Sequence, residues 1–190
     1  MILPIVAYGH RVLKTLSKDI DKDYPDLEVL IAHMFETMYA TNGVGLAAPQ
    51  VNRNIRLFVV DAQPFSEDYP EADGVKKVVI NAQILEEEGE EWSFEEGCLS
   101  VPDIHEGVMR KPRIKIKYLD ENWIAHEEWL DGVVARIVQH EYDHIEGKVF
   151  IDRLSSMRRM LLKRKLHDIS TGNISTKYRM IFPSLKKGKR

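Results

Sequence analysis

The chain has 190 residues, of which 44% are hydrophobic and 30% are charged. This is the composition of a globular protein, and the length favours one domain, residues 1–190, with a hydrophobic core. The single cysteine, Cys98, excludes an internal disulfide, and no stretch approaches the roughly 20 apolar residues of a membrane-spanning helix. Residues 1–10 lack the pattern of a signal peptide. We therefore expect a cytoplasmic protein that does not enter the membrane, and we expect it to be a monomer.

Positive charge is concentrated at the C-terminal end. Residues 154–190 hold 11 of the 27 Lys and Arg residues and one acid, Asp168, so that this segment carries +10 while residues 1–153 carry −13. A basic segment on an acidic body indicates a polyanionic partner, although a solvated helix with a frayed end is the alternative. We expect a basic helix from about residue 154 to 167, with Leu161 on its apolar edge, and little order beyond Thr171.

The spacing of apolar residues predicts most of the helices and strands. Apolar residues recur at helical spacing from Asp26 to Tyr39 and alternate at strand spacing over 113–120. In chain order we expect an irregular arm over 2–20, the helix from Asp26, strands at 55–61, 78–85, 113–120 and 123–130, an acidic turn at 86–91, and a short extended piece at 149–151.

The most informative stretch is the segment 131–147, which contains Gln-His-Glu-Tyr-Asp-His. Its apolar residues have helical spacing, Asp131 can cap its start, and Gly147 suits a left-handed stop. His140 and His144 are four residues apart, so both imidazoles leave one helix face. Core or capping histidines are one reading of this pair. A shared metal explains the pair better, because His-Glu-x-x-His is a metal-hydrolase pattern with the glutamate, here Glu141, as general base.

A third metal ligand must come from elsewhere in the chain. The extended pattern with a histidine six residues after His144 fails, because Phe150 occupies that position. Asp168 is the only acid of the basic segment. The remaining candidates lie upstream and are Cys98, His105 and His126. A thiolate binds Zn²⁺ or Fe²⁺ more strongly than a spare imidazole, so Cys98 is favoured. Together with His140 and His144 it would leave a fourth position open for water, as in a catalytic site.

Three segments together resemble bacterial peptide deformylases: Gly43–Gln50, Glu96–Ser100 and Gln139–Gly147. They stand in the order and spacing of that family, and the resemblance extends over residues 1 to about 155. It implies an α+β fold in which antiparallel β-sheets wrap around a central helix that carries the metal motif. It also implies removal of the formyl group from N-formylmethionine on new polypeptides. Fe²⁺ would be the usual metal, with Zn²⁺ able to substitute, and the C-terminal segment would dock on the ribosome.

The resemblance also assigns roles to individual residues. The metal ligands would be Cys98, His140 and His144. Glu141 would be the general base, and the side-chain amide of Gln50 and the backbone N–H of Leu99 would stabilise the oxyanion. Substrate contacts are expected at Val44, Gly45, Phe94, Glu96, Gly97, Val133 and Ile137.

Two residues near the expected pocket rim depart from the family pattern. His105 stands where many members have arginine, and Arg136 stands where an apolar residue is common. We expect them to affect the preference for the residue after methionine. Two other functions remain open at this stage. One is a zinc peptidase of another His-Glu-x-x-His class, which needs a downstream third ligand; the other is a non-catalytic, metal-stabilised RNA-binding module, which needs four protein ligands.

Overall fold

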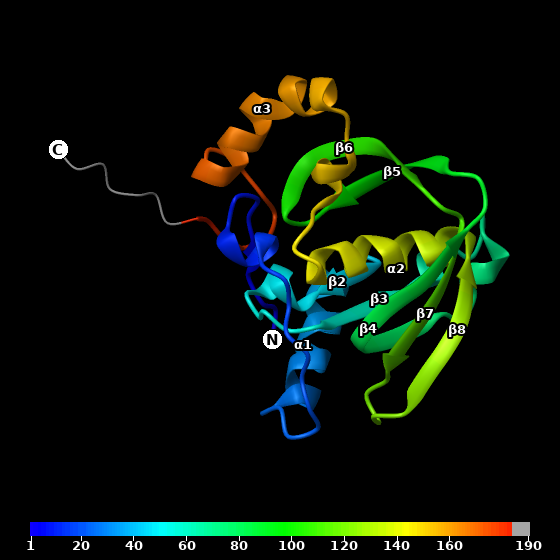
Figure 1. Ribbon diagram of the computed structural model, residues 1–190. Helices are drawn as coiled ribbons and strands as arrows, with labels where there is room; N and C mark the ends of the chain where they lie inside the picture. The colour runs from blue at the N-terminus through cyan, green and yellow to red at the C-terminus, as the bar shows by residue number, and fades with distance from the viewer. Residues whose placement is uncertain (184–190) are drawn as a thin grey trace.

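The computed structural model describes residues 1–183 of the chain (Figure 1). A five-stranded antiparallel sheet has the strand order β2-β3-β4-β7-β8, and β5 and β6 form a separate hairpin. The strands are β1 (Ile5–Val6), β2 (Gly45–Ala47), β3 (Leu57–Asp61), β4 (Lys76–Glu88), β5 (Trp92–Cys98), β6 (Val101–Arg110), β7 (Arg113–Leu119), β8 (Ala125–Asp131) and β9 (Met180–Ile181). The α-helices are α1 (Leu27–Ala40), α2 (Gly132–Ile145) and α3 (Ser156–Thr171). Short 3₁₀ turns occur at Arg11–Lys14, Ala48–Val51, Gln63–Phe65, Pro70–Ala72 and Phe150–Arg153.

Helix α2 lies between the five-stranded sheet and the β5–β6 hairpin (Figure 1). Its residues Val133, Val134 and Val138 pack into one core cluster with Phe58 and Ile116 of the sheet. The other face of the sheet packs against α1. The predicted α+β fold, with antiparallel sheets around the central helix, is confirmed.

Side-chain alternation along β3 explains how one strand serves two helices. Leu57 and Val59 point into the cluster that contains the α1 residue Met34, whereas Phe58 and Val60 point into the α2 cluster. Because successive side chains of a strand point to opposite faces, a strand covered on both faces reads as a continuous apolar run.

The ends of α2 differ from their predicted caps in one respect. Asp131 occupies the N-cap position, but its side chain accepts no capping hydrogen bond. Glu71, distant in sequence, accepts instead from the N–H of Val133 at 3.1 Å. At the other end Gly147 has φ +71°, the left-handed conformation that was predicted for it. A side chain there would place Cβ 3.0 Å from the backbone of Lys14, so the position suits glycine alone.

Three other predictions are wrong in detail. The acidic turn begins later than expected, because Glu86 to Glu88 continue β4, with Glu86 opposite Lys115 and Glu88 opposite Arg113 of β7. Residues 149–151 form no strand, because only Val149 is extended and Phe150 and Ile151 belong to the 3₁₀ turn Phe150–Arg153. Leu161 is 66% exposed and lies outside the apolar edge of α3, which consists of Leu162, Leu166 and Ile169.

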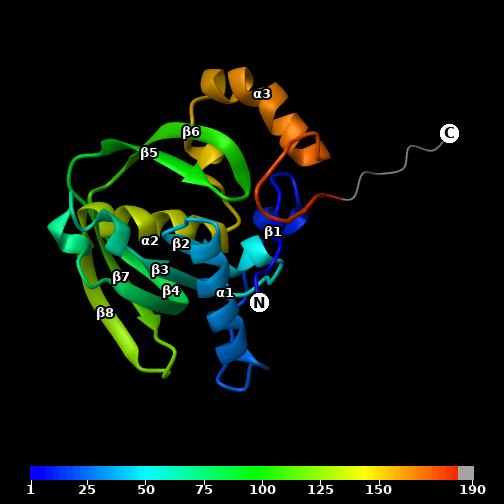
Figure 2. The same ribbon diagram turned by 180° about the vertical axis from the view of Figure 1, so that it is seen from behind.

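The chain beyond Thr171 is also more ordered than predicted. It turns back from α3 and forms β9, which pairs in parallel with β1 near the N-terminus. Figure 2 shows this segment beside β1, seen from behind. The basic residues from 184 onward lie outside the described residues. No helix within residues 1–183 is long and apolar enough to cross a membrane.

Candidate active site

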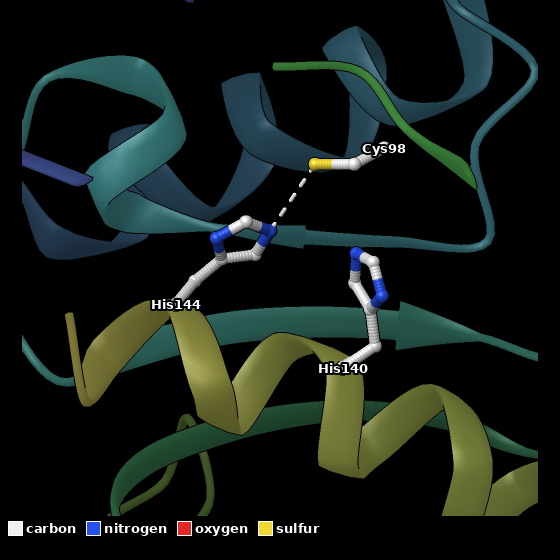
Figure 3. A group of neighbouring side chains, drawn as sticks. All are labelled: Cys98, His140 and His144. Carbon is white, nitrogen blue, oxygen red and sulfur yellow. Dashed lines mark hydrogen bonds between the residues drawn. The ribbon is translucent and has the colours of Figure 1, made fainter. Parts of the chain in front are cut away.

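Three side chains with metal-binding atoms converge between α2 and the hairpin. Cys98 lies at the end of β5, and His140 and His144 leave the same face of α2 toward it (Figure 3). Their donor atoms all lie within 4.8 Å of one another, and Cys98 Sγ is 3.3 Å from His144 Nε2. One sulfur and two imidazole nitrogens at this separation fit around a single divalent ion, so the residues present could hold a metal.

The environment of Cys98 favours the thiolate that a metal requires. Burial by itself would raise the pKa of the thiol, but the nearby imidazoles of His144 and His140 outweigh it and lower the pKa to about 5. A metal ligand must be deprotonated. The two histidines therefore favour the thiolate form of Cys98, which is the form that binds a metal ion.

His140 is oriented by a buried carboxylate. Its Nδ1 lies 2.8 Å from Glu96 Oε2, so that with Nδ1 protonated it donates to this oxygen and leaves the lone pair of Nε2 free. A carboxylate behind a metal-binding histidine fixes the tautomer and the ring orientation. Glu96 was predicted to contact substrate. The structure places it behind His140, although it also lines the cleft.

Arg110 and His140 keep Glu96 ionised. Burial would raise the pKa of this carboxyl, but the bidentate hydrogen bonds from Arg110, at 2.7 and 2.9 Å, and the contact with His140 hold it well below its usual range. Arg136 donates a further hydrogen bond to Glu96 at 3.1 Å. Arg110 also donates to Asp143 of α2 at 2.7 Å. The hairpin and the helix are thus joined by paired charges.

Arg136 lines the cleft near which it was expected, as His105 also does, but its side chain is buried in the cleft wall. Only 2% of the residue is exposed. Its guanidinium donates to the carbonyls of Trp92 and Val108 as well as to Glu96, and it stacks over the Trp92 ring at 4.8 Å. Sequence reasoning missed this cluster of buried charges. The signal that could have found it is an arginine and an acid, Asp143, on the same helix as the metal motif.

Glu141 and Gln50 both lie against β2. Only 4% of Glu141 is exposed, and burial raises the pKa of its carboxyl to about 7 in spite of the two neighbouring imidazoles. A β-carbon at Gly45 would lie 2.4 Å from Glu141 Oε1, so the glycine makes room for this carboxylate. Gln50 Oε1 accepts from the N–H of Ala47 at 2.8 Å, which turns Nε2 toward Cys98 Sγ at 3.4 Å.

A cleft of about 830 Å³ opens over these groups. Of the residues predicted to contact substrate, it is lined by Val44, Gly45, Phe94, Glu96, Gly97 and Ile137, and it is also lined by Leu99. Val133 is absent from the lining. It is fully buried in the core cluster against which Phe94 packs. Sequence reasoning also missed four lining residues from the C-terminal segment, Ser175, Thr176, Lys177 and Tyr178.

This geometry is that of a metal-dependent hydrolase. Three protein donors leave metal coordination open, a carboxylate with a pKa near neutrality lies beside them, and amide donors line the same cleft.

Comparison with known proteins agrees with this class. The family model described as "Polypeptide deformylase" matches residues 2–160. The peptide deformylase of Christiangramia forsetii is 55% identical, and the alignment covers 100% of both chains. A solved peptide deformylase from Legionella pneumophila has 35% identity and a TM-score of 0.78, covering 91% of this chain and 98% of that one. Another, from Acinetobacter baumannii with Met-Ala-Ser bound, has 38% identity and a TM-score of 0.75, covering 81% and 99%. The chain belongs to the polypeptide deformylase family.

Replacing Glu96 by glutamine tests the orienting carboxylate. Without its charge, His140 loses a strong acceptor, Arg136 loses its counter-ion and Arg110 keeps only Asp143. We expect the affinity for Zn²⁺ to fall about 10- to 100-fold, the range measured for partners of metal-binding histidines. Competition with a coloured chelator measures it.

The matched control is Glu106→Gln. Glu106 is the cross-strand neighbour of Glu96 in the same hairpin, but it pairs with the exposed Arg158. Its substitution is expected to leave zinc affinity unchanged. Equal affinities for the two variants would contradict the role assigned to Glu96.

Proposed function

We propose that the cleft removes the formyl group from the N-terminal formylmethionine of newly made polypeptides, with Cys98, His140 and His144 as the metal ligands. The observation that carries this assignment is the convergence of these three donors with Glu141 in one cleft of a deformylase fold. The A. baumannii relative binds Met-Ala-Ser, which is the peptide that remains when formyl-Met-Ala-Ser loses its formyl group.

The donor set supports a divalent transition metal. Thiolate and imidazole ligands suit both Fe²⁺ and Zn²⁺, and we propose Fe²⁺ as the ion used, with Zn²⁺ able to substitute. When bound, the ion supplies Lewis acidity that lowers the pKa of water and polarises the formyl oxygen.

Glu141 is proposed to move the proton. Its carboxyl is buried, and its Oε2 has no hydrogen-bond partner within residues 1–183, so this oxygen is free to accept a proton from the attacking water. A pKa near 7 lets the same group return that proton to the leaving amine. The bond between the formyl carbon and the methionine nitrogen breaks, and formate leaves.

Two donors are proposed for the oxyanion that develops on the formyl oxygen. One is Gln50 Nε2, whose orientation is fixed by the hydrogen bond from Ala47 to the other end of the amide. The other is the N–H of Leu99. Donors held in place before the reaction stabilise the transition state without having to reorganise.

The substrate main chain is proposed to add to the free edge of β2. This strand pairs on one side with β3 and has its other side toward the cleft, where Val44 and Gly45 lie. An extended peptide can hydrogen-bond to such an edge. The methionine side chain would lie against Phe94 and Ile137, with Val133 supporting Ile137 from the core.

The alternative functions lack a supporting observation. Within residues 1–183 the metal-donor cluster has three members, and none comes from the segment after α2. A peptidase with a downstream ligand needs such a donor, and a structural metal site needs a fourth protein ligand.

Formate release from formyl-Met-Ala-Ser tests the function. The zinc- or iron-loaded chain is expected to release formate, and Glu141→Gln is expected to lower kcat by about 10²- to 10⁴-fold, the usual contribution of general acid–base catalysis. Metal content should be unchanged, because Glu141 is not a ligand. Glu146→Gln, at the C-cap of the same helix but paired with Arg56 away from the cleft, is the control that should keep full activity. Full activity of the Glu141 variant would refute the general-base assignment.

We also propose that the protein is a cytoplasmic monomer of one domain, and that its basic segment 154–190 binds ribosomal RNA. Arg159, Lys163, Arg164 and Lys165 of α3 are exposed, while the helix packs on the hairpin through its other side. Deleting the segment would also remove residues that line the cleft, so charge reversal is the cleaner test.

Reversing Lys163, Arg164 and Lys165 to glutamate should weaken ribosome binding about 10-fold at low salt, because phosphate contacts supply most of such affinity. Sedimentation with ribosomes at several salt concentrations measures it. The control reverses three exposed cations elsewhere, Lys22, Arg53 and Lys148. If both triple variants bind as the unmodified chain does, α3 is not the docking element.

A further inference from the structure

The turn that carries Leu99 is held by both ends of the chain. Leu99 and Ser100 are the two turn residues between β5 and β6, with Cys98 paired to Val101. The carbonyl of Ser100 accepts from the N–H of Tyr8 at 2.8 Å. The carbonyl of Leu99 accepts from the hydroxyl of Tyr178 at 2.8 Å. Two segments that are remote from the turn in sequence therefore bind its two carbonyls.

The segment that carries Tyr178 is itself fastened. It leads into β9, which pairs with β1. The N–H of Ile5 donates to the carbonyl of Arg179, and the N–H of Ala7 donates to the carbonyl of Ile181, both at 2.8 Å. The hydroxyl of Thr176 donates to the carbonyl of Tyr178 at 2.7 Å. The phenol therefore reaches Leu99 from a backbone that is fixed on both sides.

The remaining backbone polar group of the turn residue Leu99 is its N–H. Among the hydrogen bonds of residues 1–183, none uses the N–H of Leu99. Leu99 and Tyr178 both line the cleft, and Leu99 follows Cys98 directly. The Leu99 N–H shares a rigid peptide plane with the carbonyl of Cys98, which is paired with Val101, and only the φ and ψ rotations of Leu99 separate this plane from the Leu99 carbonyl. With Tyr178 holding that carbonyl as well, both sides of Leu99 are fixed and its N–H has little freedom to turn.

We infer that Tyr178 is a positioning residue for deformylation: its hydroxyl anchors the Leu99 carbonyl and so holds the Leu99 N–H ready for the developing oxyanion. This inference rests on the proposed function. It also gives the C-terminal segment a role in catalysis that is separate from binding RNA, because Tyr178 acts within the cleft while the exposed cations of α3 lie outside it.

The test compares Tyr178→Phe with Tyr118→Phe. Each variant removes one hydroxyl and the hydrogen bond that it donates, to Leu99 in one case and to Glu128 at 2.7 Å on the five-stranded sheet in the other. Tyr178→Phe should lower kcat for formyl-Met-Ala-Ser about 10-fold, less than the 10²- to 10³-fold loss seen when an oxyanion donor is removed outright. Its KM should stay within about twofold of that of the unmodified enzyme, since only the transition state uses the donor. Tyr118→Phe should change neither constant.

A second measurement does not depend on turnover. In the zinc-loaded protein, the NMR order parameter of the Leu99 N–H should fall from about 0.85, typical of rigid backbone, to below about 0.6 in Tyr178→Phe, with no change in Tyr118→Phe. An unchanged kcat, a raised KM with unchanged kcat, or an unaltered Leu99 order parameter would each overturn the inference. Absence of formate release from the unmodified enzyme would instead refute the proposed function, and the order parameter would still test the contact.

Discussion

The buried carboxylate of Glu96 joins the hairpin that carries Cys98 to the helix that carries His140 and His144. It receives two hydrogen bonds from Arg110, one from Arg136 and one from His140. If the hairpin and the helix moved apart, a buried charge would lose its partner. Removing one partner of a buried ion pair costs about 3–5 kcal/mol, so this movement is strongly disfavoured. This requirement fixes the distance across which Cys98 meets the two histidines.

The two carboxylates of the cleft show how the same burial produces opposite results. Glu96 is surrounded by cations, which hold its pKa well below the usual range. Glu141 is also buried but has no arginine partner among residues 1–183, and its pKa rises to about 7. One group therefore remains a fixed negative charge that orients a ligand, and the other can take up and release a proton. Such a separation of pKa values between neighbouring acids distinguishes an orienting group from a proton carrier.

The sequence predicted the parts of the site that depend on local spacing. His140 and His144 are four residues apart on an amphipathic helix, and the glycine-rich segment 43–50 has few side chains to hinder a close approach, so these features could be read directly. The contacts of Glu96, Arg136 and Tyr178 could not be predicted, because each joins segments that are far apart in the chain. A periodic pattern shows which face of an element is buried but not which distant residue it contacts. The same reason explains the cap of α2, which comes from Glu71 rather than from Asp131. The strand β9 escaped prediction because two paired residues are too short to show a period.

The central claim is that Cys98, His140 and His144 hold one catalytic ion. The most direct measurement prepares the chain without metal, adds Fe²⁺ in the absence of oxygen, and follows bound metal together with formate release from formyl-Met-Ala-Ser. The account predicts that the rate rises in proportion to bound metal and stops rising at one ion per chain, and that Cys98→Ala fails to reach this rate. Formate release at full rate without bound metal would contradict it.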